Sequence, residues 1–380
     1  MRTAFGLFGT LLLLPMMFVL SASPVRGQDK DKDKDKKDDN RQTEEVALTT
    51  CDGLRLAGTW YPASKGRQAD CVIMVHNYGK EFDSRKGAFP SLAKDLQDAG
   101  FSVLTFDLRG HGRSTRAATV FDPKLFTDLN LFPWNRNVSG IPTPQKALTM
   151  KSINISQFNA NYFPFMINDI VAARRFLDER NDAGQCNAGA VHLIADRESG
   201  SLAMAWLHGE YLRNGINALQ LGGVNPKHVA GTDIMSATFL SYRPTQKAGQ
   251  ITKHLEKEKP LFENIGFVRE SVREKVSMAF VYGDGDEKAK AASRAVFTGF
   301  GIPAGAKEDK DRGKYLVEVE KGSTLAGIDL LDQTRVPGVD KKIIEFIKAT
   351  TKKNITGNAW KQRNPGTYDP QSFPFASYMK

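Results

Sequence analysis

The stretch HLIADRESGSLAMAW, residues 192–206, has the pattern of a buried strand that turns sharply into a helix. Such a turn can hold a serine, cysteine or aspartate as a nucleophile, provided that the residues two positions before and after it are small. Ala195 and Ser199 meet this requirement, and the residue between them is Arg197. A guanidinium stays protonated and has no lone pair that attacks a carbonyl carbon, so the apex of this turn carries no nucleophile.

Two serines that follow the arginine provide an alternative. If Ser199 or Ser201 were the nucleophile, the apex would be shifted along the chain. A shift to Ser199 places Arg197 where a small residue is required and disturbs the helical register of Leu202 and Ala203. The pattern favours Arg197 at the apex, and the alternative of a serine nucleophile stays open.

Alternating strands and helices are expected to position this turn. Residues 45–63 predict a hairpin, CVIMV (71–75) predicts a buried parallel strand, and a helix (89–100) and a strand (101–106) follow. Strand, helix and strand at this spacing indicate a right-handed crossover in a parallel sheet. After the turn we expect a strand at INALQLGG (216–223), a helical cap-like segment at 229–275, and two more strands with their helices.

The ends of the chain differ in composition from its middle. Arg2, the apolar run from Phe5 to Leu20 and the small residues after it predict a signal peptide over residues 1–27, and hence a secreted or periplasmic protein. The run is short for a membrane span and Pro15 interrupts it, so we expect no stable membrane anchor. The other predicted parts are a charged disordered linker (28–44), a domain (45–350) with an aromatic and proline-rich insertion (115–165), and a C-terminal extension (351–380).

The charge and the cysteines narrow the choice of ligand. The net charge of +10 is spread over 380 residues without interleaved aromatic residues, so we expect no nucleic-acid partner. The spacing of Cys51, Cys71 and Cys186 matches no metal motif. No cofactor motif was found, and we expect no metal and no cofactor.

Several local features together resemble the α/β-hydrolase superfamily. The loop His76, Asn77, Tyr78 and Gly79 is similar to the family's His-Gly loop, which supplies an oxyanion-hole amide, and FDLRGHGRS (106–114) is similar to the turn after its fourth strand. The resemblance implies an α/β-hydrolase fold: a mostly parallel, twisted sheet of about eight strands flanked by helices, here with a long insertion after the fourth strand.

The same resemblance implies where a catalytic triad would lie. Arg197 occupies the nucleophile position, and Asp286 in the turn YGDGDE occupies the acid position. The histidine position falls near Thr324, and all six histidines precede Asp286 in the chain. General-base activation of a hydroxyl therefore has no candidate in the family geometry.

The resemblance also leads to two hypotheses about contacts. The first is that Arg197 and Asp286, with Glu198 as a third member, form an ion pair that fills the former active site. The alternative role for Arg197 is to bind an anionic ligand. The second is a disulfide between Cys71 and Cys186, whose strands are neighbours in this superfamily, with Cys51 left as a buried thiol.

Two functions follow from these features. The first is a secreted, catalytically degenerate α/β-hydrolase-fold protein that acts as a binding or structural module, with an anionic small molecule or a cell-surface molecule as its partner. The second is an active secreted carboxylesterase or peptidase-like hydrolase that uses Ser199 or Ser201. The missing histidine favours the first, whereas the oxyanion-type loop and the small residues of the turn keep the second open.

Overall fold

The chain divides into two compact units, residues 1–37 and residues 38–380. The computed structural model describes residues 42–115, 122–140, 152–212, 230–244, 271–319, 323–353 and 359–361, all in the second unit. The predicted signal peptide, nearly all of the predicted linker and most of the C-terminal extension lie outside these ranges. None of the helices in the described ranges combines the length and the apolar composition that crossing a membrane requires.

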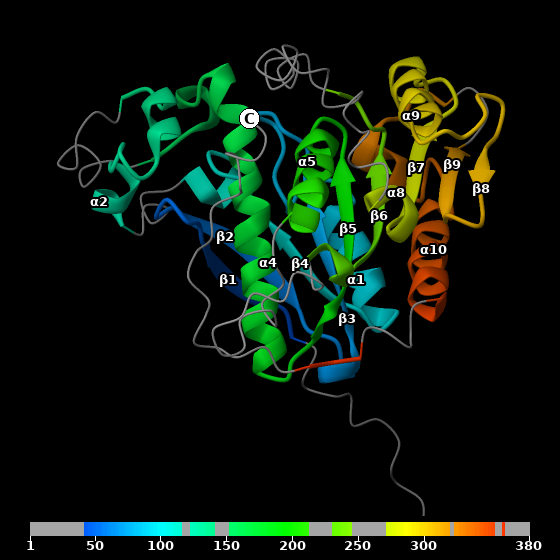
Figure 1. Cartoon of the computed structure of the whole chain (residues 1–380), viewed down its shortest axis with the longest axis horizontal. Helices are drawn as coiled ribbons and strands as arrows, with labels where there is room; N and C mark the ends of the chain where they lie inside the picture. The colour runs from blue at the N-terminus through cyan, green and yellow to red at the C-terminus, as the bar shows by residue number, and fades with distance from the viewer. Residues whose placement is uncertain are drawn as a thin grey trace, which may run out of the picture. The chain divides into compact units, whose positions relative to one another are not determined.

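Nine strands form one sheet in the order β1-β2-β4-β3-β5-β6-β7-β9-β8 (Figure 1). They are β1 (Glu44–Thr49), β2 (Arg55–Tyr61), β3 (Asp70–Val75), β4 (Ser102–Phe106), β5 (Asn187–Asp196), β6 (Ile234–Leu240), β7 (Ser277–Gly283), β8 (Glu308–Asp309) and β9 (Lys314–Val319). The strands from β4 to β9 pair in parallel, whereas the β1–β2 hairpin and β8 pair antiparallel at the two edges. The sheet is therefore mostly parallel, as predicted, and the two-residue β8 is its additional short strand.

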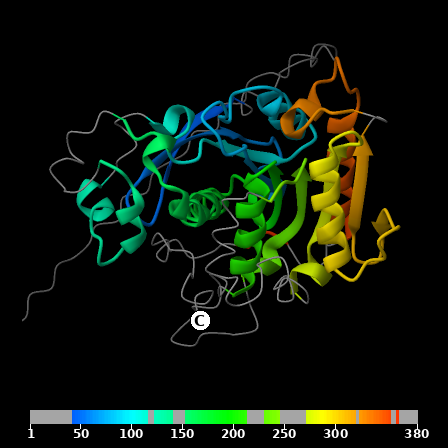
Figure 2. The same cartoon turned by 90° about the horizontal axis from the view of Figure 1, so that it is seen from above.

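Helices cover both faces of this sheet (Figure 2). The α-helices are α1 (Phe89–Asp98), α2 (Pro123–Phe126), α4 (Ile167–Asp182), α5 (Ser199–Leu212), α8 (Ser271–Lys275), α9 (Glu287–Gly299) and α10 (Val339–Lys353); the 3-10 helices are η2 (Gly66–Gln68), η3 (Gly112–Thr115), η5 (Pro133–Asn137), η6 (Ile155–Gln157), η7 (Ala160–Met166), η9 (Ala230–Asp233) and η11 (Gly327–Leu331). The core on one face includes residues of α4, α5, α8 and α9, and the core on the other includes residues of α1 and α10. Both faces of the central strands are therefore shielded from water, which accounts for their continuous apolar runs.

The predicted helical segment at 229–275 was wrong over much of its described part, because it contains a central strand. Residues 234–240, with the sequence IMSATFL, form β6, fully buried and hydrogen-bonded to β5 on one side and β7 on the other. Small Ser and Thr side chains made this stretch look polar, but β-branched and aromatic residues suit a strand that is covered on both faces. The described end of the segment, α8, is helical. The strand predicted at 216–223 lies outside the described residues.

A buried ionic cluster ties the predicted insertion to the sheet. Arg109, in the turn after β4, donates to Asp52 in the β1–β2 turn (Nη1 to Oδ2, 2.8 Å) and to Asp169 in α4 (Nε to Oδ1, 2.7 Å). Tyr162 of the insertion contacts the Arg109 guanidinium and donates to Asn135 (2.9 Å). All five side chains are buried. The contacts within the cluster replace the hydration that its charged groups lose on burial.

The three cysteines are buried free thiols, so the predicted Cys71–Cys186 disulfide is not present in the structure. The two thiols nevertheless lie side by side, and Cys186 raises the pKa of Cys71 in addition to the larger effect of burial. The predicted strand neighbourhood was therefore right, whereas the covalent bond was not.

The helix α10 continues to Lys353, three residues into the predicted C-terminal extension. In the described part of the C-terminal extension, Trp360 donates to the carbonyl oxygen of Asn181 (3.1 Å), and the Arg67 guanidinium lies over its indole ring. This part of the extension therefore lies against the end of α4.

Candidate functional site

The turn between β5 and α5 has the sharp geometry that its small residues predicted. β5 ends at Asp196, α5 begins at Ser199, and Arg197 between them has a φ of 45°, in the left-handed region that side chains rarely adopt. The helix then passes so close to Tyr242 that a Cβ atom on Gly200 would lie 2.7 Å from its ring. Arg197 is thus the apex residue of a tightly folded strand-to-helix turn.

The Arg197 side chain is bound to the loop that follows β9. Its Nη2 donates to the carbonyl oxygen of Ala326 (2.6 Å) and to Oδ2 of Asp329 (2.8 Å). Its guanidinium carbon lies 5.2 Å from the centre of the Phe82 ring, in the loop after β3. One cation therefore connects the turn to two other loops at the carboxyl edge of the sheet.

Asp196, immediately before the apex, is a buried carboxylate beside this cation. Its Oδ1 lies 3.8 Å from Nε of Arg197, and Ile328 donates a backbone hydrogen bond to it. Burial raises the pKa of Asp196 from 3.8 to about 7, against the lowering effect of Arg197. The loop after β9 passes so close that a Cβ atom on Gly327 would lie 2.0 Å from Oδ1 of Asp196, so only glycine fits there.

The side chain of Asn77 occupies the point where two backbone amides converge. Its Oδ1 accepts hydrogen bonds from the amide of Tyr78 (2.7 Å) and from the amide of Glu198 (3.2 Å). An amide of the loop after β3 and the amide that follows the apex of the turn are the two donors of an oxyanion hole in α/β hydrolases. In this chain a carboxamide oxygen from the protein itself lies between them, and 3 % of Asn77 is exposed.

The two histidines nearest to this loop are held as neutral hydrogen-bonding groups. Nε2 of His76 accepts from the amide of Leu108 (3.0 Å), and Nε2 of His111 accepts from the amide of Gly79 (3.2 Å). Burial lowers the pKa of His76, and burial together with the neighbouring His76 lowers the pKa of His111 to about 3. Both rings brace backbone, and neither is free to accept a proton from a hydroxyl.

Asp286 has a different partner from the one predicted. Both of its carboxylate oxygens lie 2.8 Å from Nη2 of Arg243, in the loop after β6, and its Oδ1 also accepts from the amide of Ala289 at the start of α9. The proposed Arg197–Asp286 ion pair was therefore wrong. Asp329, which follows the neighbouring strand β9, takes that place, and Glu198 contributes its backbone amide to Asn77.

Thr324, at the predicted histidine position, is an exposed residue between β9 and η11. The backbone beside it is fixed, since the amide of Gly285 donates to the carbonyl oxygen of Ser323 (2.8 Å). The described histidines are His76, His111, His192 and His208, and none of them lies on this loop.

Ser199 and Ser201, the alternative nucleophiles, lie at the start of α5. Their exposed fractions are 0 % and 1 %, respectively. No hydrogen bond within the described residues joins either hydroxyl to a histidine. Among the residues that the structure describes, neither serine has a base, and both side chains are buried.

The sequence analysis placed Asn77 in the oxyanion-type loop but did not predict the role of its side chain, and it missed Asp196, Arg243 and Asp329 as members of the site. Asn77 did carry a signal, because it stands where the family's loop has a glycine. The other three are common surface residue types in loops or at a strand end, and no local pattern distinguishes them. Within the described residues, no three His, Cys, Asp or Glu side chains are placed to hold a metal ion.

The strand order, the parallel crossovers and the sharp turn after β5 define an α/β-hydrolase fold. Among solved structures, the chain is similar to an esterase of Pyrococcus furiosus (12% identity, TM-score 0.45, covering 81% of this chain and 91% of that one). It is also similar to a dienelactone hydrolase from Anabaena variabilis (13%, 0.45, 83% and 98%) and to an α/β hydrolase from a Penicillium species (12%, 0.46, 81% and 99%). No protein-family model and no curated protein sequence matches the chain.

Proposed function

We propose that this chain is a secreted, non-catalytic α/β-hydrolase-fold protein that acts as a binding or structural module. The observation that carries the proposal is the position of Asn77, whose Oδ1 takes the hydrogen bonds of the Tyr78 and Glu198 amides. A substrate carbonyl would need the same two donors to stabilise its developing negative charge. The site is therefore occupied by the protein's own side chain.

The neighbouring contacts support the same function. Arg197 stands at the apex and is bound to Ala326 and Asp329, so the nucleophile position holds a loop in place. Asp286 is neutralised by Arg243 instead of orienting an imidazole. A nucleophile and a base would have to be introduced, and Asp286 released from Arg243, before acyl transfer could proceed by the family mechanism.

Activity measurements on the purified full chain test the absence of catalysis. We expect no covalent labelling by a fluorophosphonate probe and no turnover of short p-nitrophenyl esters above the rate in buffer. The Arg197→Ser variant should be equally inactive, because a hydroxyl at the apex still lacks a base. Labelling that disappears in Ser199→Ala or Ser201→Ala, but persists in the exposed control Ser139→Ala, would overturn the proposal in favour of an active serine hydrolase.

The secreted location has a separate test. Expressed in a bacterium with its own leader, the protein should be exported and lose its N-terminal residues, with a new N-terminus between Ala22 and Gln28. N-terminal sequencing of the exported form measures this cleavage. Retention of the uncleaved chain in the cytoplasm would reject secretion and leave the assignment of the site unaffected.

A further inference from the structure

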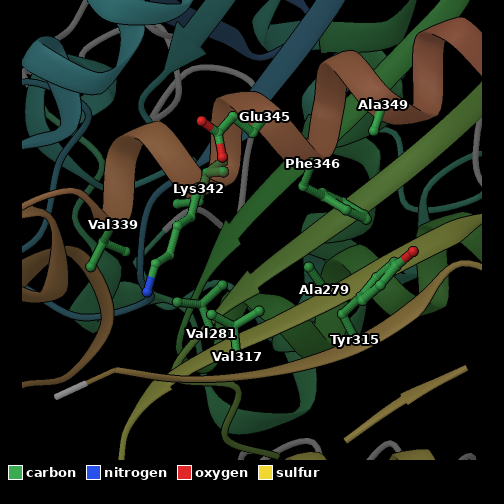
Figure 3. A pocket seen from close by; sticks show the side chains of 10 residues that line it. Ala279, Val281, Tyr315, Val317, Val339, Lys342, Glu345, Phe346 and Ala349 are labelled. Carbon is green, nitrogen blue, oxygen red and sulfur yellow. The ribbon is translucent and has the colours of Figure 1, made fainter. Parts of the chain in front are cut away.

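A groove runs between α10 and the strands β7 and β9, away from the turn after β5 (Figure 3). Its volume is about 370 Å³. The floor is formed by Ala279 and Val281 of β7 and by Tyr315 and Val317 of β9, and Phe346 of α10 forms part of the wall. β9 lies next to the edge of the sheet, where only the two-residue β8 follows, so α10 leaves this part of the sheet face partly uncovered.

The side chain of Lys342 places a positive charge beside this apolar floor. Figure 3 shows the Lys342 side chain extended along the groove, with its ammonium group between Val339 and Val281, while Glu345 points away from the floor. No carboxylate of the described residues lies within ion-pair distance of Lys342. The groove thus combines an apolar surface with a positive charge at one end.

We propose that this groove binds a small amphipathic carboxylate, such as a medium-chain fatty acid. The ammonium group of Lys342 would pair with the carboxylate, and the alkyl chain would lie on Val281, Val317 and Phe346. The volume of the groove is within the range of small-molecule sites, roughly 300–1,000 Å³. A protein partner, in contrast, usually covers about 800 Å² of each surface. None of the residues in the groove belongs to the turn after β5, so this proposal and the proposed function can fail separately.

Titration of the full chain with decanoate, below its micelle concentration, tests the proposal by calorimetry. We expect saturable binding that is tighter than that of decanol, which has the same chain without the charge. Lys342→Ala should weaken decanoate binding about twofold to fivefold and leave decanol binding unchanged. The matched control is Lys341→Ala, which removes an adjacent exposed lysine that does not line the groove.

A second variant fills the groove from an exposed position of α10. Ala349→Trp should abolish binding of both decanoate and decanol while the thermal unfolding curve stays close to that of the wild type. Absence of saturable decanoate binding in the wild type, or equal binding in Lys342→Ala and wild type, overturns the proposal. Self-association of the wild type that Ala349→Trp abolishes, without decanoate binding, also overturns it, since the face would then contact a second copy.

Discussion

Arg197 and Asp329 form an ion pair across the carboxyl edge of the sheet, with Nη2 2.8 Å from Oδ2. The pair joins the apex of the turn after β5 to the loop after β9, which is the loop that carries a catalytic histidine in the superfamily that this chain resembles. The two loops are thus held together by a salt bridge. The same guanidinium binds the carbonyl oxygen of Ala326, so its position is fixed by more than one contact.

A double-mutant cycle measures this ion pair. Arg197→Ala and Asp329→Ala should show a coupling of about 0.5–1 kcal/mol in the free energy of unfolding, because Asp329 is half exposed and solvent weakens the attraction. The matched cycle of Arg197→Ala with Asp286→Ala should show a coupling near zero, since Asp286 pairs with Arg243. Urea denaturation gives all of these values, and a larger coupling to Asp286 than to Asp329 would refute the described pairing.

The Asn77 side chain should contribute to stability through the two amides that it binds. Asn77→Ala leaves the amides of Tyr78 and Glu198 without this acceptor, at a cost of about 1–3 kcal/mol. Asn77→Asp keeps an acceptor oxygen and should lose less stability at pH 8. Asn130→Ala, at an exposed position, is the control and should change the free energy of unfolding by less than about 0.5 kcal/mol. Equal losses from Asn77→Ala and from the control would contradict the role given to Asn77.

Asp196 should make stability depend on pH. In the folded protein it keeps its proton up to about pH 7, whereas in the unfolded chain it releases that proton near pH 3.8. The folded state binds more protons in this window, so the contribution of Asp196 is fully present below about pH 4 and is lost as the pH rises through about 7.

Urea denaturation of the wild type and Asp196→Asn at pH 5 and pH 8 isolates this contribution. Relative to the variant, the wild type should be less stable at pH 8 than at pH 5. The buried histidines have lowered pKa values and act in the opposite direction, but they are common to both proteins. Asp98→Asn, at an exposed position, should keep the wild-type dependence, and an unchanged dependence in Asp196→Asn would disprove the assignment.

The buried cluster around Arg109 should be essential for folding. Arg109→Met leaves Asp52 and Asp169 buried without their cation, which should cost about 3–5 kcal/mol. Arg109→Lys should recover little, since a lysine cannot reproduce contacts to two carboxylates from one planar group. Thermal unfolding compares these variants with Arg55→Met, whose side chain is exposed and which should unfold like the wild type. Similar melting temperatures for Arg109→Met and Arg55→Met would rule out this role.

The sequence by itself determined the main elements of the fold and the residue types at the positions that the resemblance assigns to a triad. Apolar runs such as CVIMV identified buried strands, because only shielded strands are apolar on both faces. Ala195 and Ser199 identified the sharp turn, because a strand folded onto a helix leaves no room for larger side chains. The lack of histidine after His254 needed no structure at all.

Only the tertiary structure decided which groups meet. Asp286 and Asp329 both follow parallel strands and both end at the same edge of the sheet, so their spacing in the chain did not indicate which of them reaches Arg197. The position of β6 was missed for a similar reason, since its Ser and Thr residues are compatible with a strand only when neighbours cover both faces. Ion pairing and burial depend on loop paths and on contacts between distant segments, and these are properties of the folded chain that no local pattern carries.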